Sequence, residues 1–159
     1  MPTITITRLM EHPVEHLWPL LEDFGGIHRW SAGIKSSFIT PGSPVKGIGS
    51  ERTCQFYDGH FILERVTQVI KQRRLALEVF ETSMPLRSAE VVFGLTPTHD
   101  DGTDFTLTFD YVVKYGLLGK ATEGQILRQT MKDNLTRLLA ALDEYARTGI
   151  PIPEGWKPT

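Results

Sequence analysis

The chain has 159 residues, of which 40% are hydrophobic and 23% charged, and its formal net charge at pH 7 is −2. This length is sufficient for a domain with a substantial core, and the composition is that of an ordinary globular protein. The charge excludes the basic surface that binding to nucleic acid or anionic lipid requires. No run of about 20 apolar residues occurs, so we expect no integral membrane association.

The first ten residues, MPTITITRLM, lack the charged start and the apolar run of a secretory signal. Cys54 is the single cysteine, which excludes an internal disulfide and fits a reducing compartment. We therefore expect a cytoplasmic protein with one domain over residues 1–148, followed by a proline-rich tail over residues 149–159. The sequence leaves open whether the chain forms a homodimer.

The N-terminal elements are a strand and two short helices. Threonine and isoleucine alternate from Thr3 to Leu9, which predicts a strand. Pro13 is suited to a first helical turn and opens the stretch PVEHLWPLLEDF, which Gly25 and Gly26 are expected to end. A second short helical piece is expected over residues 27–30.

The middle of the chain, residues 34–114, reads as β structure. Turn-forming stretches divide this region into about six strands joined by short connections. The turns are expected at residues 41–44, 57–60, 71–73, 83–85 and 99–102. Short connections of this kind favour a meandering antiparallel sheet over βαβ units.

After Gly119 the pattern becomes helical as far as Arg147, over about 28 residues. Apolar residues recur there at spacings of three and four: Leu127, Met131, Leu135, Leu138, Leu142 and Tyr145. The helix must bury this stripe and the sheet must bury one face. The prediction is an α+β fold in which a curved seven-stranded antiparallel sheet wraps around a long C-terminal helix, with a pocket between them.

Alternation identifies the inward face of four strands. The inward rows are Arg52, Cys54 and Phe56; Leu75, Leu77 and Val79; Ala89, Val91, Phe93 and Leu95; and Phe105, Leu107, Phe109 and Tyr111.

Several stretches, in this order and spacing, resemble the START/Bet v 1-like (SRPBCC) superfamily, in particular its bacterial polyketide cyclase/dehydrase-type proteins. They are VEHLWPLLEDFGGIHRW, GIGSERTC, LERVTQVIKQRRLALEV, YVVKYGLLGK and NLTRLLAALDEY, and the resemblance covers about residues 3–147. It implies a helix-grip fold, with two short helices between the first and second strands, that forms a pocket. It does not imply one particular reaction.

A subset of this pattern is similar to the plant abscisic acid receptors. That similarity places Lys35, in GIKSS, at a lysine that contacts a ligand carboxylate, and it places Glu64 and Asn134 in the cavity. The receptors' gate loop is replaced here by the short turn 57–60, and their latch by residues 84–86. Hormone signalling through a phosphatase is therefore not expected.

The charged and polar candidates each have two interpretations. Lys35 and Glu64 either face solvent or meet inside the cavity, where burial of each requires a partner. Arg52 either extends to the end of its strand or forms a salt bridge with Glu64. Asn134 is either a core amide with its hydrogen bonds satisfied or a polar contact in the pocket. For Cys54 we favour a small buried residue over a nucleophile.

The leading hypothesis is a protein that binds a hydrophobic small molecule, aromatic, polyketide-like or lipid-like, with a polar or acidic end. Lys35, Arg52, Glu64 and Asn134 would orient the polar end. The wall would comprise Cys54, Phe56, Leu77, Val79, Ala89, Val91, Phe109, Tyr111, Ile126 and Thr130.

The alternative is a cofactor-independent cyclase, dehydratase or lyase. In that case Lys35 or Arg52 would stabilise an enolate, Glu64 would transfer a proton and Tyr111 would donate a hydrogen bond to a carbonyl. A module that binds other proteins is a third class, which exposed apolar patches over a filled core would favour. We expect no metal, because the one helical histidine pair, His12 and His16, straddles Pro13, and no cofactor, because no phosphate-binding motif occurs.

Overall fold

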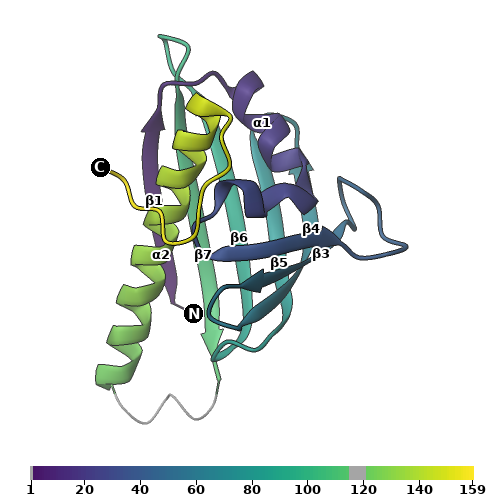
Figure 1. The fold of residues 1–159 in the computed structure, drawn as a ribbon, viewed down its shortest axis with the longest axis vertical. Helices are drawn as coiled ribbons and strands as arrows, with labels where there is room; N and C mark the ends of the chain where they lie inside the picture. The colour runs from purple at the N-terminus through teal and green to yellow at the C-terminus, as the bar shows by residue number, and fades with distance from the viewer. Residues whose placement is uncertain (1, 115–120) are drawn as a thin grey trace.

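The computed structural model describes residues 2–114 and 121–159, without the side chains of residues 121–123, and its first element is strand β1 (Thr3–Met10). The other elements, in chain order, are helix α1 (Val14–Glu22), 3-10 helix η1 (Phe24–Trp30), β2 (Ile34–Ile39), β3 (Glu51–Phe56), β4 (Phe61–Ile70), β5 (Arg74–Thr82), β6 (Leu86–Pro97), β7 (Thr103–Val113) and helix α2 (Ala121–Thr148). This order confirms the predicted elements (Figure 1). The expected helix start just after Gly119 lies outside the described residues.

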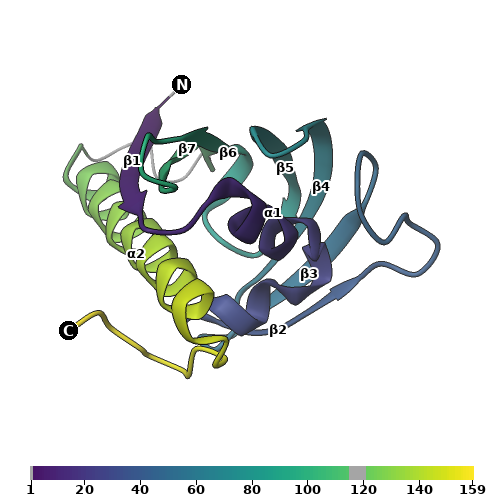
Figure 2. The same cartoon turned by 90° about the horizontal axis from the view of Figure 1, so that it is seen from above.

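Within the described residues, seven strands form one sheet in the order β1-β7-β6-β5-β4-β3-β2, and every pairing is antiparallel. Strands β2 to β7 pair with their neighbours in sequence because short turns join most of them. Figure 2 shows the sheet as an arc, with α2 lying across the opening between β1 and β2. The predicted α+β helix-grip fold is therefore confirmed.

Helix α1 follows Pro13, which is extended with φ −68° and ψ 157° and occupies the N-cap position. The buried face of the helix is made of Val14, Leu17, Trp18 and Leu21, whose spacings of three and four place them on one side. The prediction that Gly25 and Gly26 end the helical segment is wrong. The chain passes through Asp23 directly into η1, which contains both glycines.

Gly26 lies beside the exposed ion pair between Asp23 and Arg29. A Cβ atom at this position would meet the ends of both side chains, which are free to move aside into solvent. The next strand is tied to this turn by Ser37 on β2, whose hydroxyl donates a hydrogen bond of 2.6 Å to the Gly25 carbonyl. Helix η1 therefore lies against β2.

The core lies on the concave face of the sheet, and the inward rows predicted for β5, β6 and β7 are confirmed. Every member of these three rows is buried. On the opposite face of β6, Glu90 is exposed and Val92 is half-buried. The strand period of two therefore determines which side chains reach the interior.

Helix α2 is buried unevenly along its length. Leu139, Ala141 and Leu142 in its C-terminal half are fully buried, whereas Met131 and Leu135 are only half-buried. The C-terminal half packs beside β1, α1 and η1, and the earlier turns lie over a cavity. None of the described helices is long and apolar enough to cross a membrane.

The tail, residues 149–159, has no regular structure but packs against the domain (Figure 1, yellow). The backbone amide of Ile152 donates to the Arg29 carbonyl at 2.8 Å, and that of Gly155 donates to the Ala32 carbonyl at 3.1 Å. Ile152 forms a small apolar cluster with Ala32 and Ala141, against which Trp156 also packs. These contacts place the tail beside the junction of η1 and β2.

Candidate functional site

A cavity of about 430 Å³ lies between the concave face of the sheet, the η1–β2 junction and the middle turns of α2. Most of its wall is apolar. The sheet contributes Phe56, Ile62, Val79, Leu86, Val91, Phe93, Leu107 and Phe109, and α2 contributes Met131, Leu135 and Leu138. An apolar cavity of this size is typical of a small-molecule site.

Two charged side chains lie inside the cavity wall and form an ion pair. Arg52 on β3 and Glu64 on β4 are 3% and 4% exposed, and Arg52 Nε donates to Glu64 Oε2 at 2.6 Å. The two residues are directly opposed in the ladder, so both side chains emerge on the same inward face. This salt bridge is one of the two interpretations of Arg52 offered by the sequence.

Further contacts hold the Arg52 guanidinium. Its Nη1 donates to the Phe24 carbonyl at 2.9 Å, and its Cζ lies 4.0 Å from the centroid of the Phe24 ring. The carbonyl and the ring both belong to η1, so the same helix that borders the cavity also positions its buried cation. A charge held by a carboxylate, a carbonyl and an aromatic face is well compensated.

Cys54 lies behind this pair and outside the cavity wall. Its Sγ is 3.8 Å from Glu64 Oε2. Burial raises the pKa of the Cys54 thiol to about 12, although the nearby Arg52 charge acts in the opposite direction. The thiol is therefore protonated at neutral pH, which does not favour a nucleophilic role.

The mouth of the cavity is polar. Its lining includes Tyr57 and Asp58 from the β3–β4 turn, Arg137 from α2 and Glu154 from the tail. Tyr57, Asp58 and Glu154 are exposed and Arg137 is half-buried. The site thus combines an apolar chamber, one buried ion pair and a charged opening.

The structure places seven of the predicted binding residues in the cavity wall: Arg52, Phe56, Glu64, Val79, Val91, Phe109 and Asn134. Asn134 is exposed, so it lies at the rim. The cavity lining does not include the other seven, Lys35, Cys54, Leu77, Ala89, Tyr111, Ile126 and Thr130.

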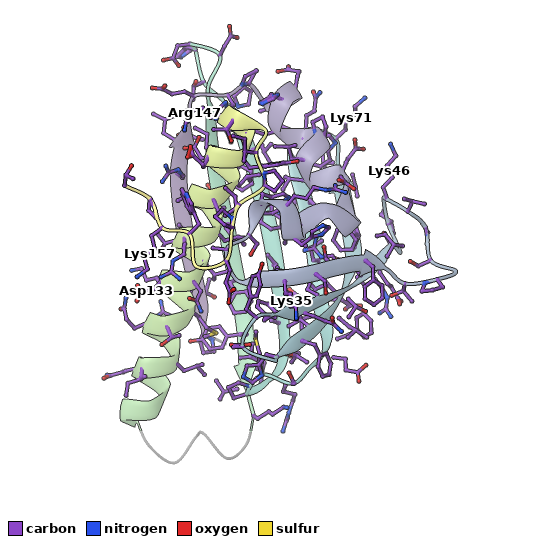
Figure 3. All side chains as sticks on the ribbon, in the orientation of Figure 1. Lys35, Lys46, Lys71, Asp133, Arg147 and Lys157 are labelled. Atoms are coloured by element: carbon purple, nitrogen blue, oxygen red, sulfur yellow. The ribbon has the colours of Figure 1, made fainter. Side chains whose placement is uncertain are left out.

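Lys35 is exposed on β2 (Figure 3). It therefore does not point into the cavity, and the partner of Glu64 is Arg52 instead. The reason is a β-bulge. Ile34 opposes Phe56 and Ser36 opposes Gln55, which leaves Lys35 as an extra residue between two ladder positions. The bulge interrupts the alternation of β2, so Lys35 points outward although Ser37, two residues later, contacts η1.

The remaining predicted residues divide into two groups. Leu77, Ala89 and Tyr111 point inward but are buried in packed core, and the Tyr111 ring stacks on Phe109 with centroids 5.6 Å apart. Ile126 and Thr130 are exposed on α2. Of the three candidate catalytic groups, Glu64 alone lines the cavity.

Several lining residues are not among the predicted site residues. Ser31, Ala32 and Gly33 come from the irregular η1–β2 junction, and Glu154 and Gly155 come from the tail. No periodic pattern marks such segments. By contrast, Met131, Leu135 and Leu138 belong to the predicted apolar stripe of α2. The helical spacing of these residues could therefore have identified them as cavity residues.

In the described part of the chain, no three His, Cys, Asp or Glu side chains lie close enough together to hold a metal ion. The described lining residues offer apolar contacts, hydrogen-bonding groups and one buried ion pair.

Similar folds occur in solved structures of low sequence identity. Protein TTHA0849 from Thermus thermophilus is 18% identical with a TM-score of 0.78, over 93% of this chain and 99% of that one. A START superfamily protein from Mycobacterium smegmatis is 16% identical with a TM-score of 0.77, over 91% and 97%. Ara h 8.0201 is 13% identical with a TM-score of 0.69, over 92% and 98%.

No curated protein is significantly similar to this chain in sequence. The structural likenesses, all below 20% identity, show the fold. In sequence, the family described as polyketide cyclase / dehydrase and lipid transport matches residues 1–147, which is nearly the whole chain. The chain therefore belongs to the polyketide cyclase / dehydrase and lipid transport family.

Proposed function

We propose that this protein binds a hydrophobic small molecule with one polar end in the cavity between the sheet and α2. The observation that carries the proposal is the combination of a 430 Å³ apolar chamber with a single buried ion pair, Arg52–Glu64, among the residues described. The apolar wall favours a hydrophobic body, and the ion pair offers a fixed point for a polar group. The family description, which includes lipid transport, is consistent with such a ligand.

Two neighbouring valines of β6 provide a matched test. Val91 is buried and lines the cavity, whereas Val92 is half-buried on the opposite face of the sheet. In Val91→Phe the larger ring enters the empty chamber, so little overpacking is expected, but the volume left for a ligand falls. In Val92→Phe the same added volume lies outside the chamber.

The measurement is a titration with the neutral fluorescent probe N-phenylnaphthylamine, which brightens in apolar surroundings. Wild type and Val92→Phe should bind the probe alike, and Val91→Phe should bind it about tenfold more weakly or not at all. Urea denaturation of the three proteins checks that each is folded. Equal binding by both variants, or no binding by the wild type, would contradict the proposal.

A further inference from the structure

Among the described residues, every fully buried cation that lines the cavity is paired with a carboxylate. Five charged side chains line the wall: Arg52, Asp58, Glu64, Arg137 and Glu154. Three are acidic and two basic. Arg52 and Glu64 are buried and neutralise each other, Arg137 is half-buried, and Asp58 and Glu154 are exposed to solvent.

Lys35 is the cation that the sequence predicts for an acidic ligand, and the β-bulge of β2 puts it outside the lining. Arg52 is the other candidate, but its charge is already matched by Glu64 at 2.6 Å. A carboxylate ligand that approached Arg52 would stand next to the Glu64 carboxylate. In a poorly solvated chamber this like-charge repulsion is strong.

The ion pair still has hydrogen-bonding capacity. The bonds of Arg52 use Nε and Nη1, and those of Glu64 use Oε2. Within the described residues, no partner is found for Arg52 Nη2 or for Glu64 Oε1, although both residues line the cavity. A donor and an acceptor of opposite charge are thus held close together on one wall.

From this arrangement we infer that the cavity selects ligands whose polar end is neutral and carries both a hydrogen-bond donor and an acceptor, and that it discriminates against carboxylates. A primary amide, or a hydroxyl next to a carbonyl, would donate to Glu64 and accept from Arg52 without adding a charge. The inference rests on the proposed function and names the chemical class of its ligand.

The experiment compares three probes with the same chain: dodecanamide, dodecanoate and dodecane, each competing with N-phenylnaphthylamine near neutral pH. Wild-type protein should bind dodecanamide at least about tenfold more tightly than dodecanoate. Dodecane measures the contribution of the apolar body. This comparison uses wild-type protein alone, so it stands even if a variant fails to fold.

Glu64→Gln keeps the shape of the side chain and removes its charge. Arg52 then has no buried counter-ion, and the preference should invert, with dodecanoate bound about tenfold more tightly than by the wild type. Glu90→Gln is the matched control, because Glu90 is exposed on the outer face of β6 and does not line the cavity. There solvent screens the charge, and the wild-type preference should hold within about twofold.

The outcomes separate the two claims. If the wild type binds neither dodecane nor N-phenylnaphthylamine, the proposed function itself fails. If it binds both, and binds dodecanoate as tightly as dodecanamide, the proposed function stands and the inference about a neutral polar end is overturned. A folded Glu64→Gln variant that still prefers the amide also overturns the inference.

Discussion

Arg52 on β3 and Glu64 on β4 oppose each other directly across the antiparallel ladder, and Arg52 Nε lies 2.6 Å from Glu64 Oε2. The backbone register therefore sets the distance between the two side chains before either makes a contact with a ligand. A pair held in this way is preorganised, because little side-chain freedom is left to lose on binding.

Arg52→Met should destabilise the protein. It leaves the Glu64 carboxylate buried without its partner, and the expected loss in the free energy of unfolding is about 3–5 kcal/mol. The double variant Arg52→Met/Glu64→Leu replaces both charges with apolar groups and should be more stable than Arg52→Met alone. Urea denaturation of the wild type, Arg52→Met, Glu64→Leu and the double variant measures the interaction energy between the two side chains. A double variant less stable than Arg52→Met would contradict the assignment of the pair.

Cys54 should be inert toward thiol reagents in the folded protein at neutral pH. Burial raises the pKa of its thiol to about 12 from an ordinary value of 9.0, so little reactive thiolate is present. Iodoacetamide should therefore label Cys54 only in protein that has unfolded in urea. Rapid labelling of the native protein would show that Cys54 is accessible.

The same pKa shift predicts how stability depends on pH. The folded state holds the Cys54 proton more tightly than the unfolded state, so this contribution is complete below pH 9 and is lost between pH 9 and about 12. Wild-type stability should fall there more steeply than that of Cys54→Ala, by up to about 1.4 kcal/mol per pH unit. If the free energies of unfolding of the two proteins change in parallel over this pH range, the raised pKa of Cys54 is contradicted.

The tail should contribute to stability through Ile152. This side chain is 7% exposed in a cluster with Ala32 and Ala141, whereas Ile150, two residues earlier, is 67% exposed. Ile152→Ala should lower the free energy of unfolding by about 2 kcal/mol, and Ile150→Ala by a few tenths. Equal effects in thermal or urea unfolding would mean that the tail is not docked as described.

Glu154 and Gly155 line the cavity, so loosening the tail should also affect ligand exchange. We expect N-phenylnaphthylamine to dissociate faster from Ile152→Ala than from Ile150→Ala in a stopped-flow displacement experiment. The comparison is informative because both variants remove the same number of methyl and methylene groups. Identical dissociation rates would show that the docked tail does not control the mouth.

Lys35→Ala should leave binding unchanged. The side chain is exposed on β2 (Figure 3) and does not line the cavity, so its removal should alter the affinity for N-phenylnaphthylamine and for dodecanoate by less than about twofold. A large loss of dodecanoate binding would mean that Lys35 reaches the ligand after all.

Much of the fold follows from local periodicity. The alternation in β5, β6 and β7 predicted their buried rows, and the spacing of Met131, Leu135 and Leu138 predicted the face of α2 that lines the cavity. These predictions held because the strand pleat and the helical turn impose their periods on any stretch that has one buried side. The sequence also identified Arg52 and Glu64 as inward candidates.

The tertiary structure alone decided what those candidates do. One extra residue in β2 turned Lys35 outward, and the register between β3 and β4 gave Glu64 the partner Arg52. The tail reaches the cavity mouth through backbone hydrogen bonds to Arg29 and Ala32, and no residue pattern marks such bonds. The sequence by itself therefore determined which faces are apolar, because that property is local. The pairing of charges and the closure of the cavity depend on contacts between distant segments, which only the folded arrangement brings together.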